Sequence, residues 1–187
     1  MGRRVGVIAI QGDFEKHVAA FQCAGAEAVP VRTPEELEGV DRAVIPGGES
    51  TTVGKLMERF GLGDALVERA KAGMPLWGTC MGLILMAKEI EGSDQYSLGL
   101  LDVTVRRNAF GAQVHSFEDS VEFEGLDTPL LAVFIRAPIV TRCGPKVEVL
   151  ARYEDKTVAV RQGNLLGTSF HPEMTDDARL HELFIKW

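Results

Sequence analysis

Short apolar runs alternate with amphipathic segments along the first half of the chain. Apolar runs at residues 4–10, 26–31 and 41–45 predict buried strands, and helical spacing predicts helices at residues 14–24, 52–60 and 64–72. Asp13 is the expected N-cap of the first helix, and Thr33 is that of a single helical turn at residues 34–37. Strands that alternate with helices in this way predict a parallel sheet covered by helices on both faces.

The second half of the chain contains few helical segments. Residues 100–106, 120–123, 130–135, 147–153, 157–161 and 165–170 are strand-like, and a last helix is expected from about residue 175 to the end. These strands predict an antiparallel extension of the sheet. No repeat or linker divides the chain, so we expect one domain over residues 1–187. Its predicted fold is α/β with three layers, a mixed, mostly parallel sheet between helices.

Composition narrows the classes of partner. The 187 residues carry a formal net charge of −7, which disfavours nucleic acid because such binding depends on basic side chains. The apolar runs fall short of the ~20 residues needed to cross a bilayer, and the N-terminus lacks the pattern of a secretory signal.

Cys23, Cys80 and Cys143 are odd in number and widely spaced, which argues against disulfides or a metal site and for the reducing cytoplasm. No glycine-rich phosphate motif indicates a nucleotide cofactor.

Cys80 lies in the segment Gly78-Thr79-Cys80-Met81-Gly82, where an apolar strand turns into an apolar helix that extends toward Ile90. Glycines around one nucleophilic residue are typical of a nucleophile elbow, with cysteine in the place of serine. A helix that begins at the thiol favours the thiolate through its positive dipole end. The alternative is an ordinary buried cysteine at a strand–helix junction.

A cysteine nucleophile needs a base, and the chain offers His17, His115, His171 and His181. His171 is favoured because Pro172 keeps it extended, and residues two apart in an extended segment face the same side. Glu173 is then placed to orient the imidazole. His171 and Cys80 both follow predicted strands, whose carboxyl ends share one sheet edge. The alternative is a surface His-Pro turn beside a solvated glutamate.

The segment Pro46-Gly47-Gly48-Glu49-Ser50 follows another predicted strand. Its glycines expose backbone N–H groups that suit an oxyanion, and the amides of Gly48 and Met81 are the expected donors. A tight turn into a helix capped by Ser50 or Thr51 is the alternative, and the two roles are compatible.

Together, residues 46–51, 78–82 and 171–173 resemble the motifs of class I (triad) glutamine amidotransferases. Three further segments, at residues 10–17, 107–118 and 133–138, resemble those of the glutaminase subunits of pyridoxal 5′-phosphate synthase. The likeness extends from about residue 5 to residue 183. It implies the flavodoxin-like fold of class I glutamine amidotransferases and a role in making vitamin B6.

The resemblance implies hydrolysis of L-glutamine to L-glutamate and ammonia by a triad of Cys80, His171 and Glu173. It also implies the glutamine-binding residues, which are Gly48, Glu49, Ser50, Arg107, Ile135 and Arg136. Arginine suits the α-carboxylate of glutamine because it is planar and always charged. Without the resemblance, Arg107 is equally consistent with a solvated charge and Arg136 with a structural ion pair.

In that family the ammonia passes to a separate synthase subunit, a (β/α)₈ barrel in a dodecameric ring, so the resemblance implies such a partner. It places Gln11 and Gly12 near the oxyanion loop and the partner surface, whereas a plain strand–helix turn is the alternative for them. The chain departs from the family pattern at Met81, where alanine is common, and at Ala112, where arginine is frequent. Only the backbone amide of Met81 is used, so we expect little effect there.

Three other readings remain open. One is a glutaminase subunit of another pathway, such as histidine biosynthesis, against which residues 107–111 and 134–138 argue. Another is a cysteine peptidase or redox chaperone on a similar fold, where the His-Pro-Glu and Pro-Gly-Gly-Glu-Ser segments are not expected. A third is a non-catalytic binding subunit, which is disfavoured because every triad position is filled.

Overall fold

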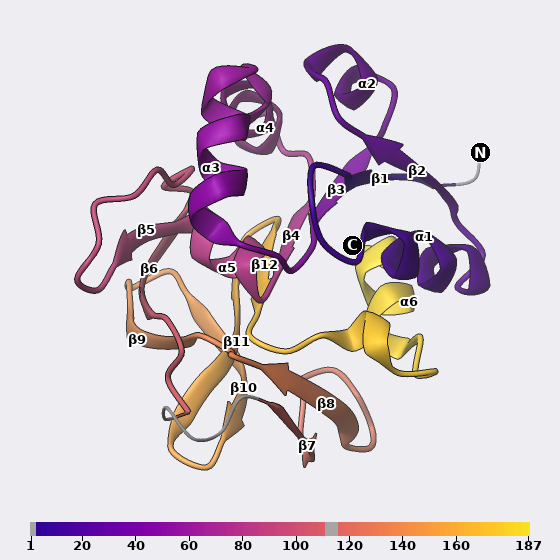
Figure 1. Cartoon of the computed structure of the whole chain (residues 1–187). Helices are drawn as coiled ribbons and strands as arrows, with labels where there is room; N and C mark the ends of the chain where they lie inside the picture. Colours follow the sequence, from indigo (N-terminus) through magenta and orange to yellow (C-terminus); the bar gives the residue numbers. More distant parts are fainter. Residues whose placement is uncertain (1–2, 111–115) are drawn as a thin grey trace.

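The computed structural model describes residues 3–110 and 116–187, and its centre is a large mixed sheet (Figure 1). Within these residues ten strands form this sheet, and β1 to β4 and β12 are mutually parallel. The strands follow the order β2 (Glu27–Val31), β1 (Arg4–Ile8), β3 (Arg42–Ile45), β4 (Leu76–Thr79), β12 (Leu165–Thr168), β11 (Lys156–Gln162), β9 (Ile139–Cys143), β6 (Leu101–Arg106) and β5 (Ala87–Ile90), with β10 (Glu148–Tyr153) paired to β11. The predicted α/β fold is therefore confirmed.

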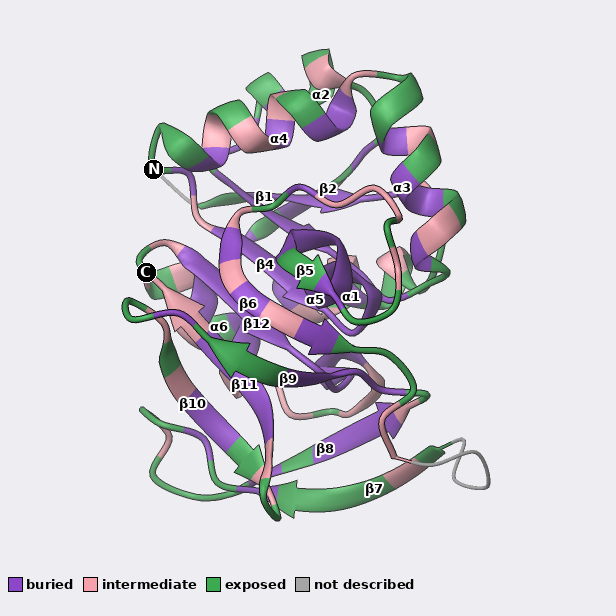
Figure 2. Cartoon of the chain, turned by 90° about the vertical axis from the view of Figure 1, so that its left-hand side faces the viewer, coloured by how far each residue is buried: buried purple, intermediate pink, exposed green. Residues whose placement is uncertain are grey.

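Helices cover both faces of the sheet, as the alternating pattern predicted (Figure 1). One face carries α2 (Pro34–Glu38), α3 (Ser50–Arg59), α4 (Leu62–Lys71) and α5 (Met81–Met86), and the other carries α1 (Phe14–Cys23) and α6 (Arg179–Lys186). Each face has its own apolar cluster, with Met57 and Leu66 in one and Phe21 and Phe184 in the other. The central strands are buried between them, whereas the outer faces of the helices are exposed (Figure 2).

The antiparallel extension differs from the expectation in one part. The strands β7 (Ser116–Val121) and β8 (Leu130–Ile135) pair with each other and form a separate two-stranded sheet. Leu130, Ala132 and Phe134 of β8 pack into the cluster that contains Phe21 and Phe184, whereas Leu131 is exposed. The strands β7 and β8 are therefore held by burial against this cluster and not by pairing with the edge of the main sheet.

Two strands of the main sheet were not predicted. The helical spacing after Cys80 suggested a helix reaching Ile90, but α5 ends at Met86 and residues 87–90 form β5, parallel to β6. The strand β9, which pairs with β6 and β11, was not distinguished from a loop. Both segments are short, so their pairing with distant strands decides their conformation rather than local spacing.

Helix ends also show where the local signals were right and where they failed. Thr33 caps α2 through a complete capping box, as expected. Asp13 stands at the N-cap of α1, but its side chain accepts no hydrogen bond from the helix. Glu49, rather than Ser50 or Thr51, caps α3 and accepts from the amides of both Thr51 and Thr52.

The last helix is shorter than expected. It begins at Arg179, because a separate 3₁₀ turn, η1 (Pro172–Met174), precedes it.

No helix among residues 3–110 and 116–187 is both long enough and apolar enough to span a bilayer.

The junction between β4 and α5 requires glycine on both sides of Cys80. A β-carbon on Gly78 would collide with the backbone of Gly82, and one on Gly82 would collide with the carbonyl oxygen of Ile45 in β3. The predicted reason for these glycines, close approach of a neighbouring strand, is therefore confirmed. This packing fixes α5 against the sheet directly behind Cys80.

We expect Gly82→Ala to lower the free energy of unfolding by about 1–3 kcal/mol, because the added methyl meets rigid backbone. Gly39→Ala is the matched control. Its added methyl meets first the flexible end of the Arg4 side chain, so its effect should stay below about 1 kcal/mol. Urea denaturation of both variants measures the difference, and equal stabilities would contradict this account of the junction.

Candidate active site

Cys80 occupies the sharp turn between β4 and α5 in a backbone conformation that is rare outside glycine. Its φ is 49° and its ψ is −102°, and such strain persists only where the surroundings impose it. The amide of Cys80 donates to the carbonyl of Thr168 in β12 at 2.8 Å, which ties the turn to the sheet. Only 8% of Cys80 is exposed. The predicted elbow is thus present, with its sulfur 3.7 Å from the carbonyl oxygen of Ile135.

His171 and Glu173 form a buried pair, as the sequence predicted. Nδ1 of His171 lies 2.7 Å from Oε1 of Glu173, and the Glu173 side chain is completely buried. We expected an extended backbone to place the two side chains on the same side. Instead, Glu173 lies in the η1 turn. The amide of His171 donates to the carbonyl of Val133 in β8, which fixes the start of this turn.

The electrostatics of the pair favour an imidazolium beside a carboxylate. Burial opposes the charged ring, but the interactions with Cys80 and Glu173 raise the pKa of His171 to about 10. Burial also opposes the charged form of Glu173, but the nearby His17 and His171 hold the pKa of its carboxyl well below the usual range. Nε2 of His171 is buried and has no geometrically favourable hydrogen bond to the described residues. This nitrogen is therefore free to exchange a proton with the sulfur or a substrate.

The loop after β3 packs directly onto this pair. A β-carbon on Gly47 would collide with the imidazole ring of His171, and one on Gly48 would lie 3.3 Å from the Cε atom of Met81. The two residues expected to donate to an oxyanion, Gly48 and Met81, are therefore neighbours beside Cys80. Because Met81 is the first residue of α5, its amide is one of those that have no partner within the helix.

A cavity of about 220 Å³ opens over Cys80. Its lining includes the nucleophile, His171, Met81 and every residue expected to bind substrate: Gly48, Glu49, Ser50, Arg107, Ile135 and Arg136. Ile84 and Asn108 also line it, and neither was singled out from the sequence. Residues from five separate parts of the chain thus surround one volume.

Two of the expected binding residues have additional structural roles. The carboxylate of Glu49 caps α3, and hydrogen bonds from Thr52 and Thr51 lower its pKa to about 2. Nη1 of Arg107 donates at 2.9 Å to Oε1 of Gln95. Arg107 is exposed, and this hydrogen bond holds its guanidinium beside the cavity. Arg136 is exposed and has a positive φ of 44°.

Gln95 is a residue that the sequence analysis missed. Its Oε1 accepts hydrogen bonds from Ser50 and Thr51 at the start of α3 as well as from Arg107. It joins two walls of the cavity from a segment with no recognisable motif, so nothing local in the sequence indicated it.

Gln11 and Gly12 lie against the loop after β3. Oε1 of Gln11 accepts from the amide of Glu49 at 3.3 Å, and a β-carbon on Gly12 would collide with the carbonyl oxygen of Gly47. Their expected proximity to the oxyanion loop therefore agrees with the contacts. The other two described histidines, His17 and His181, are buried behind Glu173, whereas His115 and Ala112 lie outside the described residues.

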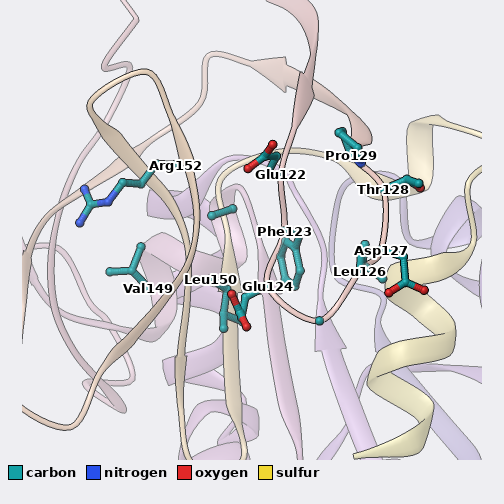
Figure 3. A pocket seen from close by; sticks show the side chains of 12 residues that line it. Glu122, Phe123, Glu124, Leu126, Asp127, Thr128, Pro129, Val149, Leu150 and Arg152 are labelled. Atoms are coloured by element: carbon teal, nitrogen blue, oxygen red, sulfur yellow. The ribbon is translucent and has the colours of Figure 1, made fainter.

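A larger cavity, of about 650 Å³, shares no lining residue with the cavity over Cys80, and Figure 3 shows the side chains that line it. Residues 122–129 and 149–152 line it, including the acidic side chains of Glu122, Glu124 and Asp127. It contains no cysteine or histidine and none of the residues expected to bind or react. The smaller cavity, which has the Cys80 thiol and a buried imidazole–carboxylate pair beside it, is therefore the candidate active site.

Comparison with known proteins agrees with this geometry. Residues 7–187 match the SNO glutamine amidotransferase family. The chain is 57% identical to the pyridoxal 5′-phosphate synthase subunit PdxT of Mycolicibacterium vanbaalenii, over 97% of this chain and 96% of that protein. It is 51% identical to the subunit of the same name from Methanothrix thermoacetophila, over 98% of this chain and 99% of that protein.

Solved structures give the same result. The crystal structure of a glutamine amidotransferase superimposes with a TM-score of 0.94 at 52% identity and covers 97% of both chains. The structure of PurLQS from Thermotoga maritima, at 19% identity and a TM-score of 0.71, is similar in fold alone. With the family match over nearly its whole length, the chain belongs to the SNO glutamine amidotransferase family.

Proposed function

We propose that this chain is a glutaminase that releases ammonia from L-glutamine with Cys80 as nucleophile, His171 as acid–base and Glu173 as orienting carboxylate. One observation carries the proposal. The sulfur of Cys80 and the ring of His171 line the same cavity, and His171 is hydrogen-bonded to a carboxylate that is completely buried. Nucleophile, base and orienting group are the three parts that acyl transfer by cysteine needs.

The reaction follows from these positions. The Cys80 thiolate attacks the side-chain amide carbon of glutamine, and the amides of Gly48 and Met81 stabilise the oxyanion. His171 donates its proton to the departing nitrogen, so ammonia leaves and a thioester remains. His171 then takes a proton from water, which attacks the thioester and releases glutamate and the Cys80 thiolate. Glu173 keeps Nδ1 of the ring protonated and turned away from the sulfur.

The cavity lining supplies groups for the rest of the substrate. Arg107 and Arg136 are the two arginines in that lining and would receive the α-carboxylate. The carboxylate of Glu49 and the hydroxyl of Ser50 suit the α-ammonium group. The backbone of Ile135 lies beside the sulfur, where it would contact the side-chain amide.

The names of the relatives indicate the partner. The relatives that match over nearly their full length are named as subunits of pyridoxal 5′-phosphate synthase. The chain is accordingly the glutaminase subunit of that synthase, and the ammonia it releases is consumed by a synthase subunit. We propose that this partner is a (β/α)₈ barrel assembled as a dodecameric ring, and that Gln11 and Gly12 face it beside the oxyanion loop.

Removing the nucleophile tests the mechanism. We expect Cys80→Ala to lower the rate of glutamate release by at least roughly 10³-fold, because only binding and the oxyanion hole remain. Cys143→Ala is the matched control, since that free cysteine is exposed on β9, and it should retain full activity. The assay measures glutamate with and without the synthase subunit, and a Cys80→Ala protein as active as the wild type would exclude the mechanism.

The raised pKa of His171 predicts how activity depends on pH. The ring should stay protonated well above its ordinary value of 6.5, so kcat/KM should persist into alkaline solution and fall as the pH approaches about 10. In Glu173→Gln the carboxylate charge is lost, the pKa of His171 falls, and the alkaline limb should move to lower pH. A pH–rate profile of both proteins measures this, and unshifted limbs would contradict the assigned role of Glu173.

A substitution at Arg107 tests substrate recognition. Loss of one charge-assisted hydrogen bond costs about 1.5–3 kcal/mol, so Arg107→Ala should raise KM for glutamine by roughly 10- to 100-fold with a smaller change in kcat. Arg106→Ala is the control, because Arg106, the last residue of β6, pairs with Glu91 and does not line the cavity. Equal KM values for the two variants would remove Arg107 from the binding site.

A further inference from the structure

Two buried histidines lie directly behind Glu173. Nε2 of His17, on α1, is 3.2 Å from Oε2 of Glu173 and also 3.2 Å from the hydroxyl oxygen of Thr79 in β4. Nδ1 of His17 is 3.1 Å from Nε2 of His181, on α6. Both histidines are 0% exposed, and the helices that carry them lie on the same face of the sheet (Figure 1). The mechanism proposed above uses neither of them.

The carboxylate of Glu173 needs a second donor. Its Oε1 is bonded to His171, and the whole side chain is removed from water. An ionised carboxylate in such a place is strongly destabilised unless both of its oxygens are paired. Among the described residues, Nε2 of His17 is the donor that the structure brings to Oε2. Oε2 has no partner among the described residues that meets full hydrogen-bond geometry, and the same nitrogen of His17 also lies 3.2 Å from the hydroxyl oxygen of Thr79.

The direction of the proton follows from the acceptor. A carboxylate oxygen only accepts hydrogen bonds, and an imidazole nitrogen 3.2 Å from it is repelled unless that nitrogen carries a proton. Nε2 of His17 must therefore carry a proton. Nδ1 of His17 lies 3.1 Å from Nε2 of His181, whose own pKa is lowered to about 3, chiefly by burial. His181 is therefore neutral and serves His17 as a fixed polar partner.

Aromatic packing restrains the rings of both histidines. Trp77 and Phe21 contact both rings, and Phe184 packs on Trp77 and Phe21. Nδ1 of His181 is buried and has no hydrogen-bond partner among the described residues. His17 and His181 are thus polar side chains buried inside an apolar cluster. Burying them costs desolvation free energy that apolar residues at these positions would not cost.

We propose that His17 is a positioning residue of the reaction, which holds the Glu173 carboxylate in its ionised form and in place for His171 and is itself oriented by His181 and Thr79. The order of contacts is Cys80, His171, Glu173, His17 and His181. This inference rests on the proposed triad, because His17 acts only through Glu173. Through His17 and His181, the helices α1 and α6 would support the site from the face of the sheet opposite to α5.

Substitution of His17 by glutamine and by leucine tests the proposal. A glutamine amide has a donor and an acceptor about as far apart as the two ring nitrogens, so His17→Gln can keep both contacts, whereas His17→Leu fills similar volume without them. In the full chain with its synthase subunit, we expect His17→Leu to lower kcat by roughly 10- to 100-fold, as for other outer residues that orient a reactive group. KM should change less than about threefold, because His17 does not line the cavity. His17→Gln should recover most of kcat.

The outcomes are distinguishable from failure of the triad itself. If Cys80→Ala is inactive while His17→Leu has the kcat of the wild type, the role of His17 is overturned and the triad stands. Equal losses in the glutamine and leucine variants would also overturn it, because the hydrogen bonds would then not matter. If Cys80→Ala remains active, the triad fails first.

A measurement on the unmodified protein covers the case in which His17→Leu does not fold. The ¹⁵N shifts of the histidine rings report which nitrogens carry protons, and the signals missing from His17→Gln identify His17. We expect a protonated Nε2 of His17 throughout pH 6–8. An unprotonated Nε2 at pH 7 would overturn the proposal, because it could not donate to Glu173.

Discussion

A carboxylate without access to water is stable only when it is paired, and this constraint organises the site. The side chain of Glu173 is completely buried, with Nδ1 of His171 2.7 Å from one oxygen and Nε2 of His17 3.2 Å from the other. Each partner comes from a different region of the chain and is itself held by neighbours. If the carboxylate were free to leave or to take up a proton, the ring of His171 would lose both its orientation and its raised pKa.

The parallel part of the sheet explains why these groups meet. The strands β3, β4 and β12 are adjacent and parallel, so the loop with Gly47, the elbow with Cys80 and the segment leading to His171 leave the same edge. The amide of Cys80 is bonded to Thr168 of β12, which fixes the distance between the last two. Glycine is needed where another group comes close to the backbone, as at Gly47 against the imidazole ring of His171 and at Gly82 against the backbone of Ile45. The antiparallel strands and the separate β7–β8 sheet add the other walls of the cavity, through Arg107 and Ile135.

The polar residues at this site serve stability and recognition together. Glu49 both caps α3 and lines the cavity, and Gln95 joins the start of that helix to Arg107. These contacts hold the residues proposed to bind glutamine in place, and such prior ordering would lower the entropy cost of binding. On the opposite face of the sheet, His17 and His181 likewise hold each other in place through a polar contact. They lie inside an aromatic cluster.

The sequence by itself determined the features that depend on neighbouring residues. Alternating strands and helices, the elbow at Cys80, the pairing of His171 with Glu173 and the cap at Thr33 were all predicted, because each follows from spacing or backbone preference within a few residues. The tertiary structure decided what depends on distant partners: β5 and β9 as strands, the separate β7–β8 sheet, the cap at Glu49 and the contacts of Gln95. The histidines behind Glu173 belong to this second group. His17 and His181 are 164 positions apart, and only the packing of α1 and α6 on one face of the sheet gives them a common environment.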